Sequence, residues 1–192
     1  TKNTHQRASD RCAEALGKIE KKNKKRVDIV VMIQGDEPML TPEMLKQAIE
    51  PMLHDPSIEV LNLIGEILSR EEQDDPNEVK VVMDRLGDAL YFSREAIPSW
   101  KKGAKNVPML KQICIIPFRR DFLLKFNALP QTPLEIIESV DMLRVLEHGR
   151  KVRLVHTTVQ TYSVDTPDDL REVEMAMKSD TLLSRYSARQ SR

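Results

Sequence analysis

A run of β-branched and aliphatic residues, Val27–Ile33, is the feature that most constrains the fold. It carries one charge near its start, and such a continuous apolar run is typical of a buried strand in a parallel sheet. The run ends abruptly in the segment 34–38, Gln-Gly-Asp-Glu-Pro. Thr41 and Pro42 then predict the start of a helix, with a capping residue followed by a proline in the first turn. This pattern predicts a strand–loop–helix unit of an α/β protein.

Strands and helices continue to alternate along the chain. The spacing of apolar residues predicts helices over 8–24, 41–52, 120–126 and 133–149, and after 165. Apolar or alternating runs predict further strands over 59–67, 113–116 and 152–159. This order predicts an α/β class with a largely parallel sheet.

The middle of the chain adds a hairpin and two loops. Two short apolar runs, 79–83 and 89–92, flank a turn that contains Gly87, and this combination predicts a β-hairpin and therefore a mixed sheet. The segments 69–77 and 98–108 are predicted loops, and Pro117 is expected to end the strand before it.

Composition excludes several classes of protein. The chain has 192 residues, enough for one domain, and its 30 basic and 30 acidic residues give no net charge. A nucleic-acid binder that depends on bulk electrostatics would be clearly basic. No run of about 18 apolar residues predicts a membrane span. With two cysteines and no apolar leader at its N-terminus, the chain is expected in a reducing cytoplasm, and the Ser- and Arg-rich segment 180–192 is expected to fray.

Two carboxylates follow predicted strands, where ligands of open α/β sheets usually bind. Asp36 comes directly after the first strand, and Asp165 follows the strand at 152–159 after a short polar link. Together they could hold one Mg²⁺, which prefers oxygen ligands, and leave positions for phosphate oxygens. The alternative is that each carboxylate caps the helix after it, although Thr41 already serves the helix that follows Asp36. The residues alone leave both interpretations open.

Five segments resemble a known family when they are taken in order. They are 31–38 (Val-Met-Ile-Gln-Gly-Asp-Glu-Pro), 77–84 (Asn-Glu-Val-Lys-Val-Val-Met-Asp), 89–98 (Ala-Leu-Tyr-Phe-Ser-Arg-Glu-Ala-Ile-Pro), 132–139 (Thr-Pro-Leu-Glu-Ile-Ile-Glu-Ser) and 164–170 (Val-Asp-Thr-Pro-Asp-Asp-Leu). In this order they resemble the 3-deoxy-manno-octulosonate cytidylyltransferases, the CMP-KDO synthetases, over nearly the whole chain.

This resemblance implies a single cytidylyltransferase domain over 1–192 with a Rossmann-like nucleotidyltransferase fold. It also implies the reaction of CTP with a 3-deoxy-2-ulosonic sugar acid, which gives a CMP-sugar and pyrophosphate for lipopolysaccharide biosynthesis. A homodimer without nucleic-acid or membrane partners is expected as well.

The resemblance also assigns residues to the site. By similarity, Asp36 and Asp165 are the catalytic carboxylates that bind Mg²⁺. Gln34 is expected to face the sugar acid, and Arg94 to lie near it, where an arginine fork suits a carboxylate. Arg11 is expected near the nucleotide. For both arginines the alternative is a structural or surface ion pair.

Several positions depart from the family pattern. Gln112, Ile116 and Met142 stand where family members aim a His, a Tyr and a Gln toward the sugar; Gln112 and Asp141, which replaces a Glu, are still expected to contact the substrate. Arg7-Ala8-Ser9 replaces a Ser-Gly-Thr segment. Because a site built for particular hydroxyl groups discriminates strongly, these changes predict an altered sugar acid, such as an amino-substituted octulosonate. A nonulosonate is the other alternative substrate.

The strand and the CTP-binding loop that open the family pattern have no match ahead of Thr1. We therefore expect weak CTP binding and little turnover from these residues alone, and an exposed sheet edge. The alternative function is a non-catalytic remnant of the same fold that uses the hairpin, with Tyr91 and Phe92, as a dimer interface.

Overall fold

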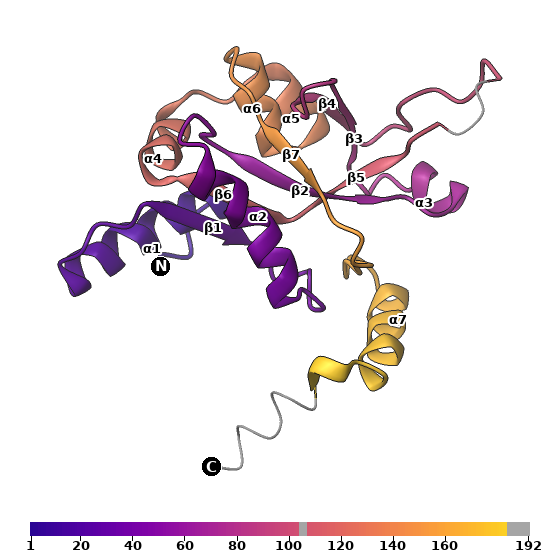
Figure 1. Ribbon diagram of the computed structural model, residues 1–192, viewed down its shortest axis with the longest axis horizontal. Helices are drawn as coiled ribbons and strands as arrows, with labels where there is room; N and C mark the ends of the chain where they lie inside the picture. Colours follow the sequence, from indigo (N-terminus) through magenta and orange to yellow (C-terminus); the bar gives the residue numbers. More distant parts are fainter. Residues whose placement is uncertain (104–106, 184–192) are drawn as a thin grey trace.

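Residues 1–103 and 107–183 are described by the computed structural model, and the expected fraying of 180–192 falls mostly outside them. Seven strands form two hydrogen-bonded groups (Figure 1). In the smaller group β1 (Ile29–Ile33) pairs with β6 (Ile115–Arg119). The larger group has the order β4 (Ala89–Ser93), β3 (Lys80–Met83), β5 (Leu110–Ile113), β2 (Leu61–Glu66) and β7 (Arg153–His156).

The strands β5 and β6 are two halves of one stretch, separated at Cys114. One edge of this stretch faces β2, through the pairs Leu63–Ile113 and Val60–Phe118. The other edge pairs with β3 along β5 and with β1 along β6, both antiparallel. The carboxyl end of β1 and the amino end of β3 therefore meet on the same edge, beside residues 112–114. This junction positions the candidate site.

Each face of the sheet carries its own apolar core. On one side, α1 (Ala8–Asn23) and α4 (Arg120–Ala128) pack with Val60 and Ile64 of the central strand region. On the other side, α2 (Pro42–His54) packs with Leu61 and Leu63. Alternate residues of this strand face opposite cores, which explains its continuous burial.

The predicted α/β class with a mixed sheet and a hairpin is confirmed, but the expected predominance of parallel pairs does not hold for the described strands. Only β2 and β7 are parallel, whereas four other pairs are antiparallel. The prediction assumed that each helix crosses over to a parallel neighbour. Instead, the 110–119 stretch enters the middle of the sheet in the opposite direction.

The sequence predicted that Pro117 ends the strand. This prediction is wrong, because Pro117 pairs with Val31 inside β6. The N–H of Arg119, two residues on, donates to Glu59 at 2.8 Å, so the N–H that Pro117 lacks would face the same side. On that side β6 makes only an isolated bridge, through Val60. The proline therefore costs no ladder hydrogen bond to β1.

The predicted helix over 133–149 is wrong in one respect, because it is two helices. These are α5 (Pro133–Glu138) and α6 (Asp141–Glu147), separated by Ser139 with a φ of 53°. The predicted loop 69–77 contains a short helix, α3 (Arg70–Asp74), which Ser69 caps. The strand expected over 152–159 is shortened to β7.

The last described helix, α7 (Pro167–Lys178), stands apart from the sheet at the end of an extended segment (Figure 1). No helix in the described part of the chain has the length and apolarity needed to cross a membrane.

Candidate active site

A cavity of about 280 Å³ opens at the junction of β1 and β3. Its walls come from the start of α1, the loop after β1, the residues before β3, the residue after β4, the 112–116 stretch, the break between α5 and α6, and the segment before α7. Six of the seven residues assigned to the site from the sequence line it: Gln34, Asp36, Arg94, Gln112, Asp141 and Asp165.

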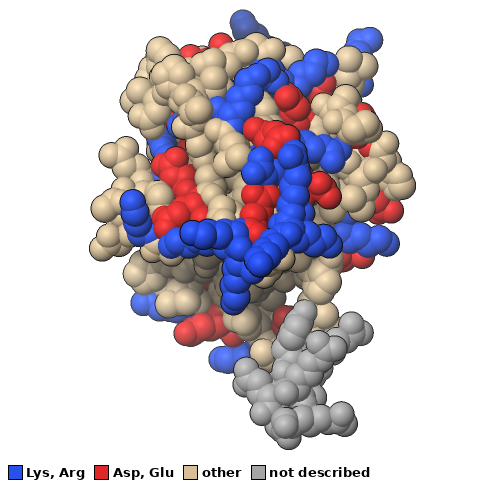
Figure 2. Space-filling model, turned by 90° about the vertical axis from the view of Figure 1, so that its left-hand side faces the viewer, with Lys and Arg blue, Asp and Glu red and all other residues tan. Residues whose placement is uncertain are grey.

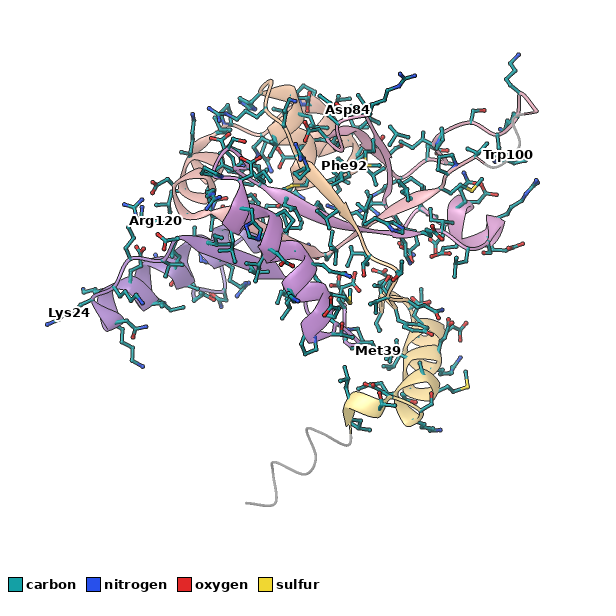
Figure 3. All side chains as sticks on the ribbon, viewed as in Figure 1. Lys24, Met39, Asp84, Phe92, Trp100 and Arg120 are labelled. Carbon is teal, nitrogen blue, oxygen red and sulfur yellow. The ribbon has the colours of Figure 1, made fainter. Side chains whose placement is uncertain are left out.

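The two carboxylates predicted to share a metal come from segments that a backbone hydrogen bond joins. The N–H of Val164 donates to the carbonyl oxygen of Asp36 at 3.0 Å, which brings the next residue, Asp165, to the loop after β1. Figure 3 shows the loop that carries Met39 beside the segment leading into α7. Burial, followed by the negative charge of Asp36, raises the pKa of Asp165. The two carboxylates therefore interact electrostatically.

The capping interpretation does not hold for either carboxylate. Thr41 caps α2, because its hydroxyl accepts a hydrogen bond from the Met44 N–H at 3.3 Å. Thr166 caps α7 in a capping box with Asp169. Neither helix start uses the side chain of Asp36 or Asp165, so both carboxylates remain available to a ligand.

The chemistry of this pair fits a hard divalent cation. Oδ1 of Asp36 is buried and has no hydrogen-bond partner among the described residues, a costly state for a carboxylate oxygen that faces no ligand. No group of three or more His, Cys, Asp and Glu within 1–103 and 107–183 could hold a metal. Two protein carboxylates nevertheless suit Mg²⁺, which usually keeps several ligands from water or from substrate phosphates.

Sequence reasoning missed a second acidic pair beside the first. Glu37 is 8% exposed, and its Oε1 accepts the Cys114 N–H at 3.2 Å across the junction. Burial, together with the charges of Asp36 and Glu78, raises the pKa of Glu37 to about 7. Glu78 is held by Lys111 at 2.8 Å. The position of Glu37 in the segment 34–38 was visible, but only the junction of strands shows that its side chain turns inward.

Arg94 also lines the cavity, and backbone carbonyls hold its guanidinium. Nε donates to the carbonyl oxygen of Glu138, and Nη1 to that of Pro76, each at 2.7 Å. The Glu138 carboxylate accepts hydrogen bonds from Tyr91, Ser93 and the Arg94 N–H, which fixes the end of β4 against α5. Because neutral carbonyls hold the guanidinium, its positive charge stays available to an anionic ligand.

Gln112 is oriented by a buried asparagine. Its Nε2 donates to Oδ1 of Asn62, whose own amide group donates to the carbonyl oxygens of Leu63 and Ile113, each at 2.8 Å. This arrangement fixes the amide of Gln112, so that its oxygen remains as an acceptor. Gln34 is held from its backbone, since its N–H donates to the carbonyl oxygen of Cys114 at 3.3 Å.

Two residues singled out from the sequence lie outside the cavity lining. Arg11 donates to the Thr1 hydroxyl and the Lys2 carbonyl at the N-terminus. Met142 is fully buried in the core on the α1 side of the sheet, so its replacement of a polar residue does not alter the cavity wall. Ile116 lines the cavity, as the resemblance to the family implies.

Arg7 is a lining residue that the motif comparison treated only as a departure. It is the residue before α1, and its Nη1 lies 3.2 Å from Oδ1 of Asp141. The same carboxylate accepts the Ser9 hydroxyl at 3.2 Å. Asp141 thus joins the start of α6 to the start of α1 while it faces the cavity.

Comparison with known proteins agrees with this geometry. A family model described as cytidylyltransferase matches residues 1–152. The 3-deoxy-manno-octulosonate cytidylyltransferase of Pelobacter propionicus is 40% identical over 180 residues, which cover 88% of this chain and 68% of the relative. The enzyme of the same name from Geobacter metallireducens is 40% identical over 183 residues, with 90% and 70% covered.

Solved structures support the same conclusion. A CMP:2-keto-3-deoxy-manno-octonic acid synthetase complexed with CTP superposes with a TM-score of 0.81 at 35% identity, over 93% of this chain and 70% of that one. A putative glucose-1-phosphate thymidylyltransferase from Bacillus anthracis shares the fold, with a TM-score of 0.56 at 14% identity. The predicted nucleotidyltransferase fold is confirmed, and the chain belongs to the cytidylyltransferase family.

Proposed function

We propose that this chain binds CTP and 3-deoxy-manno-octulosonate and joins them into the CMP-sugar with release of pyrophosphate, for lipopolysaccharide biosynthesis. The observation that carries the proposal is that Asp36, Asp165 and Arg94 line one cavity, where a backbone hydrogen bond joins the segments of the two carboxylates. Two relatives named 3-deoxy-manno-octulosonate cytidylyltransferase are each 40% identical to this chain, over 88% and 90% of its length.

The reaction consists of one substitution at phosphorus. The anomeric hydroxyl of the sugar acid attacks the α-phosphorus of CTP, the bond to the β-phosphate bridging oxygen breaks, and pyrophosphate leaves. The hydroxyl proton passes to solvent. Catalysis of this kind depends on positioning and on neutralising charge.

Asp36 and Asp165 are the proposed ligands of Mg²⁺. A bound Mg²⁺ supplies neutralisation of the phosphate charge. Arg94 is proposed to bind the carboxylate of the sugar acid, and Gln34 and Gln112 to orient its hydroxyl groups through their amides. Arg11 remains the residue proposed near the nucleotide.

The proposal extends to assembly and location. We propose a homodimer, supported by large apolar side chains that the hairpin and α5 leave exposed: Leu86, Leu90, Ile136 and Ile137. Phe92 is fully buried and Tyr91 bonds to Glu138, so the expected contribution of Phe92 to an interface is wrong.

The described cysteines, Cys12 and Cys114, are unpaired, which is consistent with the proposed cytoplasmic location.

A substrate panel tests the proposed activity. The chain is incubated with CTP, Mg²⁺ and, separately, 3-deoxy-manno-octulosonate, an amino-substituted octulosonate and a nonulosonate, and CMP-sugar is measured by mass spectrometry. We expect product with 3-deoxy-manno-octulosonate, at the low rate that the expected weak binding of CTP allows, so the assay uses a high concentration of CTP and a long incubation. Product with the nonulosonate alone would establish the other substrate, and no product with any acid would favour the non-catalytic alternative.

A further inference from the structure

The wall of the cavity at α1 carries an ion pair that the proposed reaction leaves unexplained. Arg7 faces Asp141 at 3.2 Å, and the Arg7 side chain is 23% exposed where it lines the cavity. The other carboxylate near Arg7 is that of Glu135, at 3.9 Å from Nη2. Glu135 is already bound by Arg144, whose Nε donates to it at 2.7 Å. Asp141 is therefore the principal partner of Arg7.

Among the residues that the structure describes, Arg7 and Arg94 are the cationic side chains that line the cavity, and they differ in what neutralises their charge. Backbone carbonyls hold the guanidinium of Arg94, so its charge is left for an anionic substrate group. The charge of Arg7 is cancelled by Asp141. The Arg7–Asp141 pair thus adds little net charge to the wall, but it presents N–H donors beside carboxylate acceptors.

A donor beside an acceptor suits one type of substrate group. A hydroxyl both donates and accepts, so neighbouring hydroxyls can donate to the Asp141 carboxylate and accept from Arg7. An ammonium group only donates, and it would be repelled by the Arg7 guanidinium. Without Arg7, a partly buried Asp141 carboxylate would instead favour an ammonium group.

We propose that Arg7 determines specificity at this site: paired with Asp141, it recognises neighbouring hydroxyl groups on the sugar acid and disfavours an amino substituent there. This inference rests on the proposed function, because it takes a sugar acid as the ligand. It also argues against the amino-substituted substrate that the departures from the family pattern predicted, since one of those departures, Met142, does not reach the cavity.

Binding measurements on two variants test this role without requiring turnover. Calorimetry compares 3-deoxy-manno-octulosonate with an analogue that carries one amino group in place of a tail hydroxyl. In Arg7→Ser, the affinity for 3-deoxy-manno-octulosonate should fall about tenfold, and the affinity for the amino analogue should fall less or rise. Asp141→Asn leaves the positive charge of Arg7 without its partner. In this variant the affinity for the amino analogue should fall below that of the unchanged chain. A purely structural ion pair would instead weaken both acids equally in both variants.

The controls distinguish a failure of the proposed role of Arg7 from a failure of the proposed function. Arg26→Ser removes an exposed arginine that pairs with Asp121 and should leave both affinities unchanged. The Ser9–Asp141 and Asn127–Ser9 hydrogen bonds still hold the start of α1 in Arg7→Ser, so thermal unfolding should change little. Arg7→Lys, which keeps the charge, should partly restore the preference. If Arg7→Ser lowered the affinity for both acids equally, only the proposed role of Arg7 would be overturned. If the unchanged chain bound neither acid, the proposed function would be overturned as well.

Discussion

The N–H of Val164 donates to the carbonyl oxygen of Asp36 at 3.0 Å, although the two residues are far apart in the sequence. This bond fixes the segment before α7 against the loop after β1. The next residue, Asp165, then lies within electrostatic reach of Asp36, and the pKa of Asp165 is raised by burial and by that charge. A backbone hydrogen bond between segments distant in the sequence therefore brings together the two carboxylates on which the proposed chemistry depends.

Replacing Arg94 with lysine tests the proposed binding of the sugar-acid carboxylate by Arg94. Lysine lacks the planar fork that bonds to both Pro76 and Glu138, so it cannot keep the same geometry and still bind a carboxylate. We expect Arg94→Lys to weaken binding of the sugar acid about tenfold. Calorimetry measures this change, and Arg85→Lys, an exposed position on the same hairpin, is the matched control. Unchanged affinity in Arg94→Lys would show that Arg94 has only the structural role.

The buried pair of Glu135 and Arg144 is expected to dominate the stability of the α5–α6 region. Glu135 is fully buried, and both of its carboxylate oxygens accept hydrogen bonds from Arg144. Glu135→Ala should lower the free energy of unfolding by about 3–5 kcal/mol, because it leaves a buried guanidinium unpaired. Urea denaturation measures this loss.

The double variant Glu135→Leu with Arg144→Met is the comparison for that prediction. It removes both charges and should cost clearly less than the single change, since no buried charge is left without a partner. A double variant that is less stable than Glu135→Ala would contradict the interpretation.

The charged face made by α1 and α4 predicts an acid-dependent loss of stability. Figure 2 shows lysines and arginines crowded on this side, with acidic residues between them. Arg120 donates to both oxygens of Glu20 at 2.9 Å and lowers the pKa of that carboxyl to about 2, from 4.5. Because the pKa is lower in the folded state, the contact stabilises the fold above pH 4.5, and this contribution is lost as the pH falls toward 2.

Glu20→Gln tests that sign directly. Urea denaturation between pH 4.5 and pH 2 should show a flatter dependence of stability on pH than in the unchanged chain. Arg120→Gln should flatten the same interval, since it removes the other partner. An unchanged slope in both variants would mean that the contact is absent in solution.

The proposed homodimer predicts a change in mass in solution. Substitution of Leu90 and Ile137 by lysine places charges on the exposed apolar surface of the hairpin and α5. Sedimentation should show a dimer for the unchanged chain and a monomer for this double variant. Leu53→Lys, at an exposed position on α2, is the control and should remain dimeric. A monomeric unchanged chain would contradict the proposal.

The sequence singled out Asp36 and Asp165 because their signals are local, and the structure places both in the lining of one cavity. Asp36 follows an apolar strand, and Thr41 stands where the cap of the next helix is expected. The sequence left a capping role open for Asp165, and the structure shows that Thr166 caps that helix instead. Their convergence could not be deduced from pattern alone, because it depends on which strands lie side by side. The resemblance to a family supplied that information.

The failures also have physical causes. Apolar spacing continues across Ser139, so nothing in the periodicity marks the left-handed residue that divides α5 from α6. Glu37 and Arg7 acquire their positions from neighbours distant in the sequence, Cys114 and Asp141 respectively. Pro117 was taken to end a strand because its pairing side was not known.

Paramagnetic broadening by Mn²⁺, used in place of Mg²⁺, tests the central claim most directly. In the NMR spectrum of the ¹⁵N-labelled chain, substoichiometric Mn²⁺ should broaden the amide signals of Gly35, Asp36 and Asp165 first. Asp36→Asn should abolish this pattern, whereas Asp168→Asn, at an exposed carboxylate paired with Arg171, should preserve it. Broadening that begins around Glu71, Glu72 and Asp75, with Asp36 and Asp165 unaffected, would contradict a metal shared by the two carboxylates.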